Sequence, residues 1–385
     1  MNEKIIYLDN AASTPIRPEA IDAMTTVLSD CYGNPSGAHK MAREARRLID
    51  DARDTLSHGL GCDPKEVIFT AGGTEADNLA IFGTQGSRDG TILASATDHH
   101  AVIAPVEQLG GQFIQVDENG LLDLDHLTHL LDENVALVSV GLVNGETGII
   151  QNLETMAEIV RSKAPKALIH TDAVQAFPWL DVASLTQSAD LISIAGHKFG
   201  SPKGVGALVV RNGIEISPMQ LGGGQELGIR SGTQNTAAIV AMAAAADVTV
   251  KNRKVTVERV AKMRDELADS LQKIPQSYET GVQVHNGTAD RSHKIAGSCH
   301  FCFEGIESEA LLFMLEQKNI LASAASSCSS GAQDPSHVLA AMGYSRNLAG
   351  GSLRLSLGHS TTWEDVDIAM KVVPKFIESL RKTGS

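Results

Sequence analysis

The segment from residue 191 to 210 reads LISIAGHKFGSPKGVGALVV, and its pattern decides the fold of the chain. Two apolar runs, at 191–194 and 207–210, flank a glycine-rich stretch that contains Lys198. Runs of this kind bounded by glycines predict two strands joined by a loop. A lysine at the end of a strand can be desolvated, which lowers its pKa and lets its amine form a Schiff base. A solvated loop lysine is the alternative.

Other apolar runs precede this segment and alternate with segments of helical periodicity. In chain order, the runs and the helical segments are 66–69, 74–82, 91–94, 135–140, 153–162 and 167–170. Alternation of strands and helices predicts an α/β fold with a mainly parallel sheet and helices on both faces. Ligands bind such sheets at the carboxyl ends of the strands, so the polar residues after each run are the candidates for function.

The later part of the chain has a different pattern. Residues 237–273 are rich in Ala, Met, Glu, Lys and Arg, which predicts long helices. Short strand-like runs, a helical segment at 307–318 and a Ser/Ala/Gly stretch then follow. We therefore expect a large domain at 13–255, and a smaller α+β domain formed by 1–12 and 256–385.

Composition excludes several classes of protein. The 385 residues carry a formal net charge of −14 without a Lys/Arg run, so we expect no direct nucleic-acid partner. No apolar stretch is long enough to span a bilayer, and the N-terminus lacks the pattern of a targeting segment. We therefore expect a cytoplasmic protein without a membrane partner. Five cysteines in so long a chain do not form a disulfide framework, so one of them is a candidate reactive thiol.

Three further groups of polar residues follow strands. Residues 70–75, TAGGTE, open a helix, where glycines and free N–H groups can bind a phosphate; a plain strand-to-helix turn is the alternative. His99 can stack on a flat cofactor and move protons, or lie on the surface. Asp172 can pair with a protonated ring nitrogen, or cap a helix. Together with Lys198, they stand in the order that a pyridoxal-phosphate site uses.

With these motifs, the chain resembles the cysteine desulfurases of the aminotransferase class V superfamily, in particular the group containing NifS and IscS. The resemblance extends from residue 7 to residue 357. The motifs are 33–36 (GNPS), 69–75 (FTAGGTE), 170–175 (HTDAVQ), 196–198 (GHK), 202–206 (PKGVG) and 230–233 (RSGT). The resemblance implies the fold type I of pyridoxal-phosphate-dependent transferases, with a mainly parallel seven-stranded sheet in the large domain.

The resemblance also implies a role for each matching residue. Lys198 would bind the cofactor covalently, Asp172 would pair with its ring nitrogen, and His99 would stack on the ring and transfer protons. Arg354 would bind the substrate carboxylate, which suits its planar fork. The remaining implied contacts are Gln175 with the ring hydroxyl, Gly73, Thr74 and His197 with the phosphate, Thr233 with the phosphate of the other subunit of a homodimer, and Asn34 and Asn144 with the substrate.

Cys328 corresponds to the catalytic cysteine in the longer Cys loop of this group, here about 322–334. Between 323 and 332 no apolar residue is larger than Ala apart from Cys328, which favours a mobile loop. Asp334 followed by Pro335 predicts that a helix starts directly after the loop. Cys299 and Cys302 lie in a predicted strand and would point to opposite faces, so we expect no metal site there.

Five positions depart from the family pattern. Gly145 replaces the second of two asparagines, and Ala195 replaces the serine before Gly-His-Lys. Gln225 and Leu227 replace a histidine and an arginine, and Ala325 replaces a glycine three residues before Cys328. These departures leave the cofactor site recognisable and concern substrate preference and turnover.

The resemblance implies a cysteine desulfurase that converts L-cysteine to L-alanine and leaves a persulfide on Cys328. A sulfur-acceptor protein, such as an iron–sulfur scaffold or a thiolation enzyme, would then receive the sulfur. One alternative is an aminotransferase or a cysteine/cystine C–S lyase of the same superfamily, which would need Lys198 but not Cys328. A catalytically degenerate scaffold in a sulfur-transfer complex is the second alternative.

Overall fold

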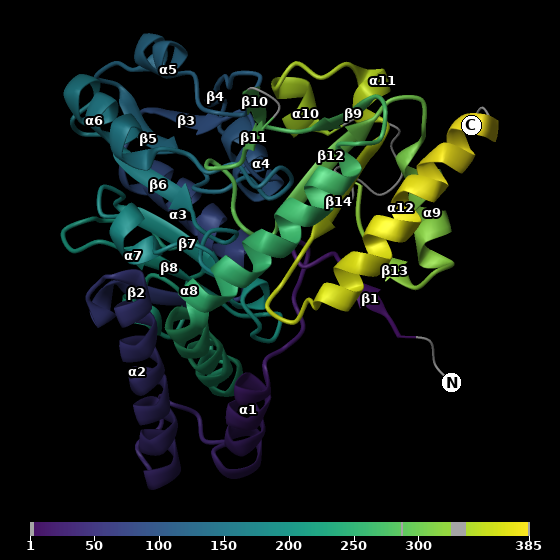
Figure 1. Ribbon diagram of the computed structural model, residues 1–385. Coiled ribbons are helices and arrows are strands. Elements are labelled where there is room, and N and C mark those ends of the chain that lie inside the picture. Colours follow the sequence, from purple (N-terminus) through teal and green to yellow (C-terminus); the bar gives the residue numbers. More distant parts are fainter. Residues whose placement is uncertain (1–3, 286–287, 325–335, 384–385) are drawn as a thin grey trace.

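A computed structural model describes residues 4–285, 288–324 and 336–383, and it is an α/β protein built on two sheets of unequal size (Figure 1). The larger sheet has seven strands in the order β2-β8-β7-β6-β5-β3-β4. Only β8 runs antiparallel to its neighbours β2 and β7; the other neighbouring pairs are parallel. The bounds are β2 Val67–Thr70, β3 Thr91–Ser95, β4 Gln112–Ile114, β5 Val135–Ser139, β6 Leu168–Asp172, β7 Leu191–Ala195 and β8 Gly206–Val210. The predicted mainly parallel, seven-stranded sheet is confirmed.

Two helical layers cover the large sheet. Successive strand residues point to opposite faces, so Leu191 packs with α3 and α4 while Ile192 packs with the helices of the other layer. Both faces are buried, which explains why these strands are continuous apolar runs. The first layer contains α3 (Gly73–Ser87) and α4 (His100–Gln108); the second contains α2 (Lys40–Leu60), α5 (Leu124–Leu130), α6 (Leu153–Lys163), α7 (Val182–Leu185) and the first part of α8 (Thr236–Leu271).

The smaller sheet is antiparallel, in the order β14-β12-β9. One apolar cluster joins it to α9, α12 and the second part of α8. The pair β1-β13 brings the N-terminal strand into the same region. The bounds are β1 Ile6–Tyr7, β9 Ser277–Glu279, β10 Gln283–His285, β11 Thr288–Asp290, β12 Ser298–Phe303, α9 Ser308–Glu316, β13 Ile320–Leu321, α10 His337–Ala341, α11 Arg346–Ala349, β14 Ser352–Ser356 and α12 Trp363–Thr383.

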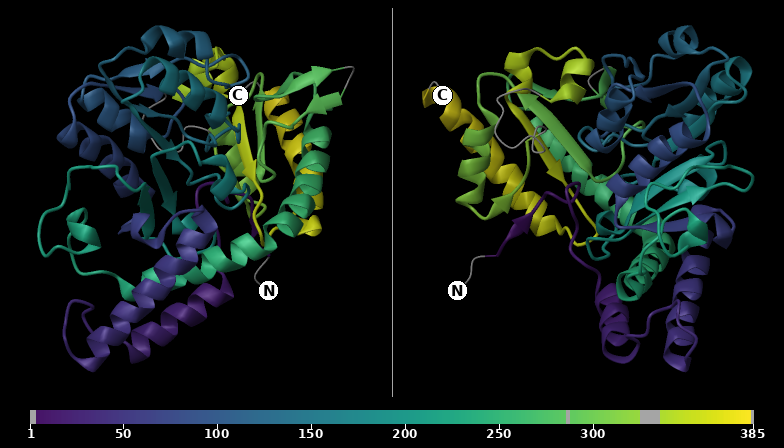
Figure 2. Two further views of the ribbon diagram at one scale, coloured as in Figure 1. Left: turned by 90° about the vertical axis from the view of Figure 1, so that its left-hand side faces the viewer. Right: turned by 180° about the vertical axis from the view of Figure 1, so that it is seen from behind.

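One continuous helix, α8, connects the two regions (Figures 1 and 2). Residues such as Ala241 and Ala245 pack against the large sheet, whereas Val260 and Leu267 pack with the small one. The sequence predicted more than one helix here, and the structure has a single 36-residue helix. The boundaries at 12/13 and 255/256 stay a prediction, with which the two apolar clusters agree apart from Ile295, which packs in the cluster of the large sheet.

Two local predictions can be compared with the structure. The helix expected at 307–318 is α9, Ser308–Glu316. The helix start expected at Asp334 and Pro335 was wrong: α10 begins at His337 and its N-cap is Ser336, whose hydroxyl accepts the N–H groups of Val338 and Leu339. Asp334, Pro335, Ala325 and Cys328 lie outside the described residues.

The pair formed by α2 and α1 (Pro18–Asp30) projects from one end of the molecule (Figure 1). Within the described ranges, none of the helices has the length and apolarity that crossing a bilayer requires.

Candidate active site

A cavity of about 440 Å³ lies at the carboxyl ends of β3, β5, β6 and β7. This is the edge at which parallel sheets bind ligands. The small sheet closes the cavity with Arg354 from β14, and the first turn of α10 contributes His337 and Val338. Nine sequence-predicted residues line it: Gly73, Thr74, His99, Asn144, Asp172, Gln175, His197, Lys198 and Arg354.

Lys198 ends the short 3-10 helix Gly196–Lys198 that directly follows β7. Its Nζ donates hydrogen bonds to the backbone oxygens of Ala11 and Ala12, at 2.5 and 3.1 Å. A Cβ on Gly196 would lie 2.6 Å from the Ser201 Oγ, and one on Gly206 would lie 2.7 Å from the backbone of Gly72. The glycines therefore allow the close packing that directs the lysine into the cavity. This geometry favours the cofactor interpretation over a solvated loop lysine.

Asp172 ends β6, and its Oδ1 accepts the N–H of Val174 at 2.8 Å. Burial raises the pKa of this carboxyl to about 6, although the hydrogen bond from Val174 and the charge of Lys198 act in the opposite direction. This contact of the Asp172 Oδ1 is of the kind made by a helix-capping residue, which was the alternative role predicted for Asp172. Its place on the cavity wall also permits the pairing with a ring nitrogen.

A polar layer lies behind Asp172. The ring of His170 is 2.8 Å from the Ser139 Oγ, 3.0 Å from the Ser193 Oγ and 3.6 Å from the Asp77 Oδ1. Burial lowers the pKa of His170 to about 3, so the ring is neutral. Burial and the nearby charge of Asp172 raise the pKa of Asp77 well above its usual value. The sequence arguments missed Asp77, although it lies one helical turn after Thr74 on the helix predicted to bind phosphate.

The N-terminus of α3 meets the cavity at Gly73 and Thr74. None of the described side chains caps this end, so N–H groups and the positive end of the helix dipole are available to an anion. Glu75, in the same turn, is directed to Arg230, with a 2.6 Å ion pair. A Cβ on Gly73 would lie 2.8 Å from Val174, so only glycine allows this approach. Beside it, burial and two nearby lysines lower the pKa of His197 to about 4, which leaves a neutral imidazole.

His99 precedes α4 and caps it, because its Nδ1 accepts the N–H of Ala101 at 3.1 Å. Desolvation and the charge of Lys198 lower its pKa, which favours the neutral ring. The preceding residue, Asp98, also lines the cavity and was missed. Burial raises the pKa of Asp98 to about 8, and its Oδ2 has no hydrogen-bond partner in the described part of the chain.

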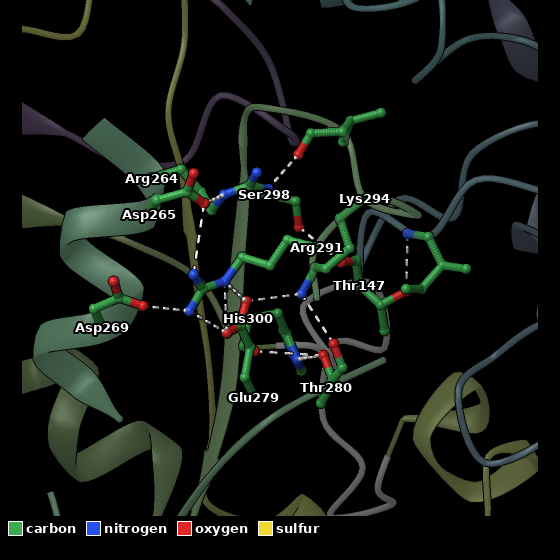
Figure 3. Close-up of polar contacts among 12 residues, drawn as sticks. Thr147, Arg264, Asp265, Asp269, Glu279, Thr280, Arg291, Lys294, Ser298 and His300 are labelled. Carbon is green, nitrogen blue, oxygen red and sulfur yellow. Dashed lines mark hydrogen bonds and ion pairs between the residues drawn. The ribbon is translucent and has the colours of Figure 1, made fainter. Parts of the chain in front are cut away.

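Asn144 organises the turn at 144–148 on the cavity wall. Its Oδ1 accepts the N–H groups of Glu146 and Thr147, both at 2.9 Å, and its Nδ2 donates to the Thr97 carbonyl at 2.8 Å. The small sheet holds the turn from behind, since the Ser298 Oγ donates to the Thr147 carbonyl at 2.9 Å (Figure 3). These bonds occupy both polar atoms of Asn144, which fixes the turn.

Arg354 points from the middle of β14 toward this turn. Its Nη1 donates to the Gly145 carbonyl at 3.1 Å, and its Nη2 contacts the Asp9 Oδ1 at 3.0 Å. Its Nε is buried and has no hydrogen-bond partner among the described residues. A guanidinium with unused donor capacity at the cavity edge is suited to bind a carboxylate.

Two of the predicted site residues that the structure describes do not line this cavity. Asn34 and Thr233 are exposed on the surface of their own chain, and the Asn34 Oδ1 accepts the N–H of Ser36. Cys328 is outside the described residues, but both neighbouring described segments touch the cavity region. Ser323 pairs with the backbone of Arg354 through bonds of 2.7 and 3.2 Å, and the Ser336 Oγ lies 2.5 Å from the Glu146 Oε2.

The other cysteines are poor candidates for a thiolate. Burial raises the pKa values of Cys62, Cys299 and Cys302 to about 12, and Cys31 is buried. Cys299 and Cys302 belong to different apolar clusters, as expected for opposite faces of β12. In the ranges that the structure describes, no group of metal-ligating side chains comes together.

A strand-end lysine, a buried acid and an uncapped helix around one cavity fit the amine, ring and phosphate contacts of pyridoxal phosphate. The fold and this arrangement are typical of the fold type I enzymes that use this cofactor. The family model "Aminotransferase class-V" matches residues 6–368, and the chain belongs to this family.

Known relatives agree with the resemblance to the NifS/IscS group. The "Cysteine desulfurase IscS" of Methanosarcina thermophila is 37% identical, over 98% of this chain and 93% of the relative. A solved structure described as "NIFS-LIKE PROTEIN" is 31% identical, with a TM-score of 0.90 over 98% of this chain and all of its own. "SspA in complex with cysteine" is 29% identical, with a TM-score of 0.79 over 92% and 99% of the two chains.

Proposed function

We propose that this chain is a pyridoxal-phosphate-dependent cysteine desulfurase, which converts L-cysteine to L-alanine and carries the sulfur as a persulfide on Cys328. The meeting of Lys198, Asp172 and Arg354 in one cavity is the observation that supports this most strongly. Full-length similarity to a protein named cysteine desulfurase, and to a structure that contains cysteine, supports the choice of substrate.

The proposed roles follow from the contacts. When bound, the cofactor supplies an electron sink for the carbon next to the substrate amine. Lys198 holds the cofactor covalently and removes the α-proton once the substrate amine has displaced it. Asp172 pairs with the ring nitrogen and Gln175 contacts the ring hydroxyl. The α3 N-terminus at Gly73 and Thr74, together with neutral His197, binds the phosphate.

Arg354 binds the substrate carboxylate. Asp9 is its present partner at 3.0 Å, so an incoming carboxylate competes with Asp9 for the guanidinium. Asn144 holds the turn beside this site, and neutral His99 accepts a proton near Lys198. Asn34 completes the proposed substrate contacts, from outside the cavity that the described residues form.

Cys328 is the proposed sulfur acceptor within the chain. Its thiolate attacks the sulfur of bound cysteine, the carbon–sulfur bond breaks, and a sulfur–sulfur bond forms. The substrate carbon then takes up a proton and leaves as alanine. The raised pKa values of Cys62, Cys299 and Cys302 make these thiols unsuitable for the step. Burial of Cys31 argues against that residue as well.

The proposed assembly is a cytoplasmic homodimer in which Thr233 of each subunit reaches the phosphate of the other. Exposed apolar side chains near Thr233 support a subunit contact: Met219, Leu221 and Leu227 are 48, 80 and 73% exposed. A second cavity, of about 510 Å³, lies between this loop and α2. The persulfide then passes to a sulfur-acceptor protein, such as an iron–sulfur scaffold or a thiolation enzyme. Light scattering on the purified protein should give twice the mass of one chain.

The deciding experiment incubates purified holoprotein with L-cysteine and measures alanine and protein-bound persulfide. We expect both, with the extra sulfur located on Cys328 by mass spectrometry. Cys328→Ala should bind the cofactor and form no persulfide. Sulfur transfer at the wild-type rate by that variant would refute the assignment.

Gly145 favours an aminotransferase or C–S lyase as the second candidate. A Cβ at this position would be 3.5 Å from Gln175, so the cavity has room where an asparagine side chain is usual. Pyruvate with free sulfide, or amino exchange with a keto acid, would identify that activity. A degenerate scaffold would give a colourless protein whose spectrum does not respond to cysteine.

A further inference from the structure

Glu146 is a cavity-lining carboxyl to which neither the sequence motifs nor the proposed reaction assigns a role. It lies in the turn fixed by Asn144, and its own N–H is one of the groups that Asn144 accepts. Two bonds from the small-sheet region hold the next residues: Ser298 to the Thr147 carbonyl, and the Ile295 N–H to the Gly148 carbonyl at 2.9 Å. The backbone of Glu146 is therefore held rigidly at the cavity wall.

The carboxyl of Glu146 connects two parts of the site. Its Oε2 accepts the hydroxyl hydrogen of Ser336 at 2.5 Å, and Ser336 also caps α10. On the other side is Arg354, which donates to the carbonyl of the neighbouring Gly145. A carboxylate that binds Arg354 must therefore come close to Glu146.

The charges at this position do not balance once such a ligand binds. Arg354 is the positive group, and Asp9 already pairs with it at 3.0 Å. Glu146 and the ligand would add two further negative charges in a half-buried place. Like charges in a site of low dielectric favour protonation of one carboxyl.

We infer that Glu146 is a proton-holding positioning residue: it takes a proton from solvent when a carboxylate binds at Arg354, and its carboxyl keeps Ser336 at the cavity wall. The inference rests on the proposed function, because it concerns the proposed substrate-carboxylate site. A protonated Glu146 removes the repulsion toward the ligand. It can still share a hydrogen bond with the Ser336 hydroxyl, which is both a donor and an acceptor.

The electrostatics of the free site agree with this role. Burial raises the pKa of Glu146 to about 7, although Ser336 and Arg354 act in the opposite direction. Cys302 on β12 also interacts electrostatically with Glu146. Elsewhere on the cavity wall the titratable groups are Asp77, Asp98, His99, Asp172, His197, Lys198 and His337. The negative charge of a bound carboxylate shifts the Glu146 equilibrium further toward the protonated form.

Propionate is a suitable probe, because it has a carboxylate but no amine that could react with the cofactor. Calorimetric titration of the holoprotein at about pH 7.5, in two buffers of different ionisation enthalpy, measures the protons taken up on binding. We expect uptake of more than about half a proton per propionate in the wild type, because Glu146 is mostly ionised at that pH before binding.

Variants identify the group that takes the proton. Glu146→Gln should abolish the uptake, whereas Glu158→Gln, a matched change at an exposed glutamate of α6, should leave it at the wild-type value. Glu146→Asp should restore part of it, which a merely structural role would not predict. Arg354→Gln should abolish propionate binding.

Wild-type uptake in Glu146→Gln would overturn the inference, as would loss of uptake in Asp98→Asn alone. Propionate that fails to bind the wild type, or binds Arg354→Gln equally well, would also overturn it. These outcomes are independent of alanine formation from cysteine, which tests the proposed function separately.

Discussion

Two regions of this molecule bury charged side chains, and they do so in opposite ways. Behind the small sheet, Glu279 lies between Lys294 and Arg291, with ion-pair distances of 3.4 and 2.8 Å (Figure 3). None of these three side chains has a buried polar atom without a partner. On the cavity wall, Asp77, Asp98 and Asp172 are all acids, and two of them have a buried oxygen without a hydrogen-bond partner among the residues that the structure describes.

The difference separates structural charge from functional charge. In the small-sheet network, opposite charges compensate the loss of hydration, and the network links α8, β9 and the 291–298 segment. On the cavity wall, burial raises the pKa values of the three acids, and the charge of Lys198 offsets only part of this at Asp172. Groups of this second kind are typical of sites that bind a charged ligand and transfer protons.

The largest expected effect is a loss of catalytic activity when Lys198 on the cavity wall is replaced. Lys198→Ala should lower alanine formation by about 10³-fold or more, because it removes both the covalent attachment and the proposed base. The visible absorbance of the bound cofactor should shift or disappear. Lys203→Ala, in the same glycine-rich loop but exposed, is the matched control and should keep the spectrum.

A substitution in the paired network of Glu279, Arg291 and Lys294 should lower the stability of the protein and leave the reaction unaffected. Lys294→Met leaves Glu279 without one of its two partners, which should lower the free energy of unfolding by about 3–5 kcal/mol. Urea unfolding followed by circular dichroism measures the loss. Lys251→Met breaks an exposed pair with Asp247 and should cost less than about 1 kcal/mol. Equal losses in the two variants would contradict the distinction.

Substituting one of the unpaired acids should stabilise the folded protein, whereas substituting a member of the paired network destabilises it. The folded-state pKa of Asp98, about 8, is above its usual value of 3.8, so ionisation of Asp98 opposes folding. Between these values, the unfolded chain releases its proton while the folded protein keeps it, and the destabilisation grows as pH rises toward 8. Asp98→Asn keeps an oxygen acceptor for Gly141 and removes the titration.

The measurement is the thermal midpoint of the cofactor-free protein across this pH range. Asp98→Asn should unfold at a higher temperature than the wild type near pH 8, and the gap should shrink toward pH 4. The exposed Asp125→Asn is the control. A gap that does not change with pH would show that folding does not raise the pKa of Asp98.

The smallest effect is expected at Gly145. Its backbone does not need a positive φ, and an added Cβ would make ordinary contact with Gln175 at 3.5 Å. Gly145→Ala should therefore change stability by less than about 0.5 kcal/mol. A moderate change in KM for cysteine at constant kcat would show that this position affects substrate fit.

Sequence periodicity predicted the parts of the molecule that are locally determined. The strands before Lys198 and Asp172 are buried on both faces, so their apolar runs were clear and the residues at their ends could be placed together. Asp77, Asp98 and Glu146 were missed because an acid in a helix or turn is usually solvated. Their burial depends on elements that are distant in the chain.

The same reason explains the other differences. The network of Glu279, Arg291 and Lys294 needs a fold before its members meet, and no spacing in the sequence indicates it. The start of α10 was placed at Asp334 and Pro335 because that pair is a strong local signal, but Ser336 supplies the cap. The composition of residues 237–273 predicted long helices without fixing their number, and in the structure α8 passes without interruption from one apolar cluster to the other.

The central claim is that the amine of Lys198 holds the cofactor in the cavity at the carboxyl ends of the strands. Borohydride reduction of the holoprotein, followed by peptide mass spectrometry, tests it directly. The cofactor mass should be found on the peptide that contains Lys198. Its recovery on another lysine, or recovery of unmodified Lys198 after complete reduction, would contradict the account.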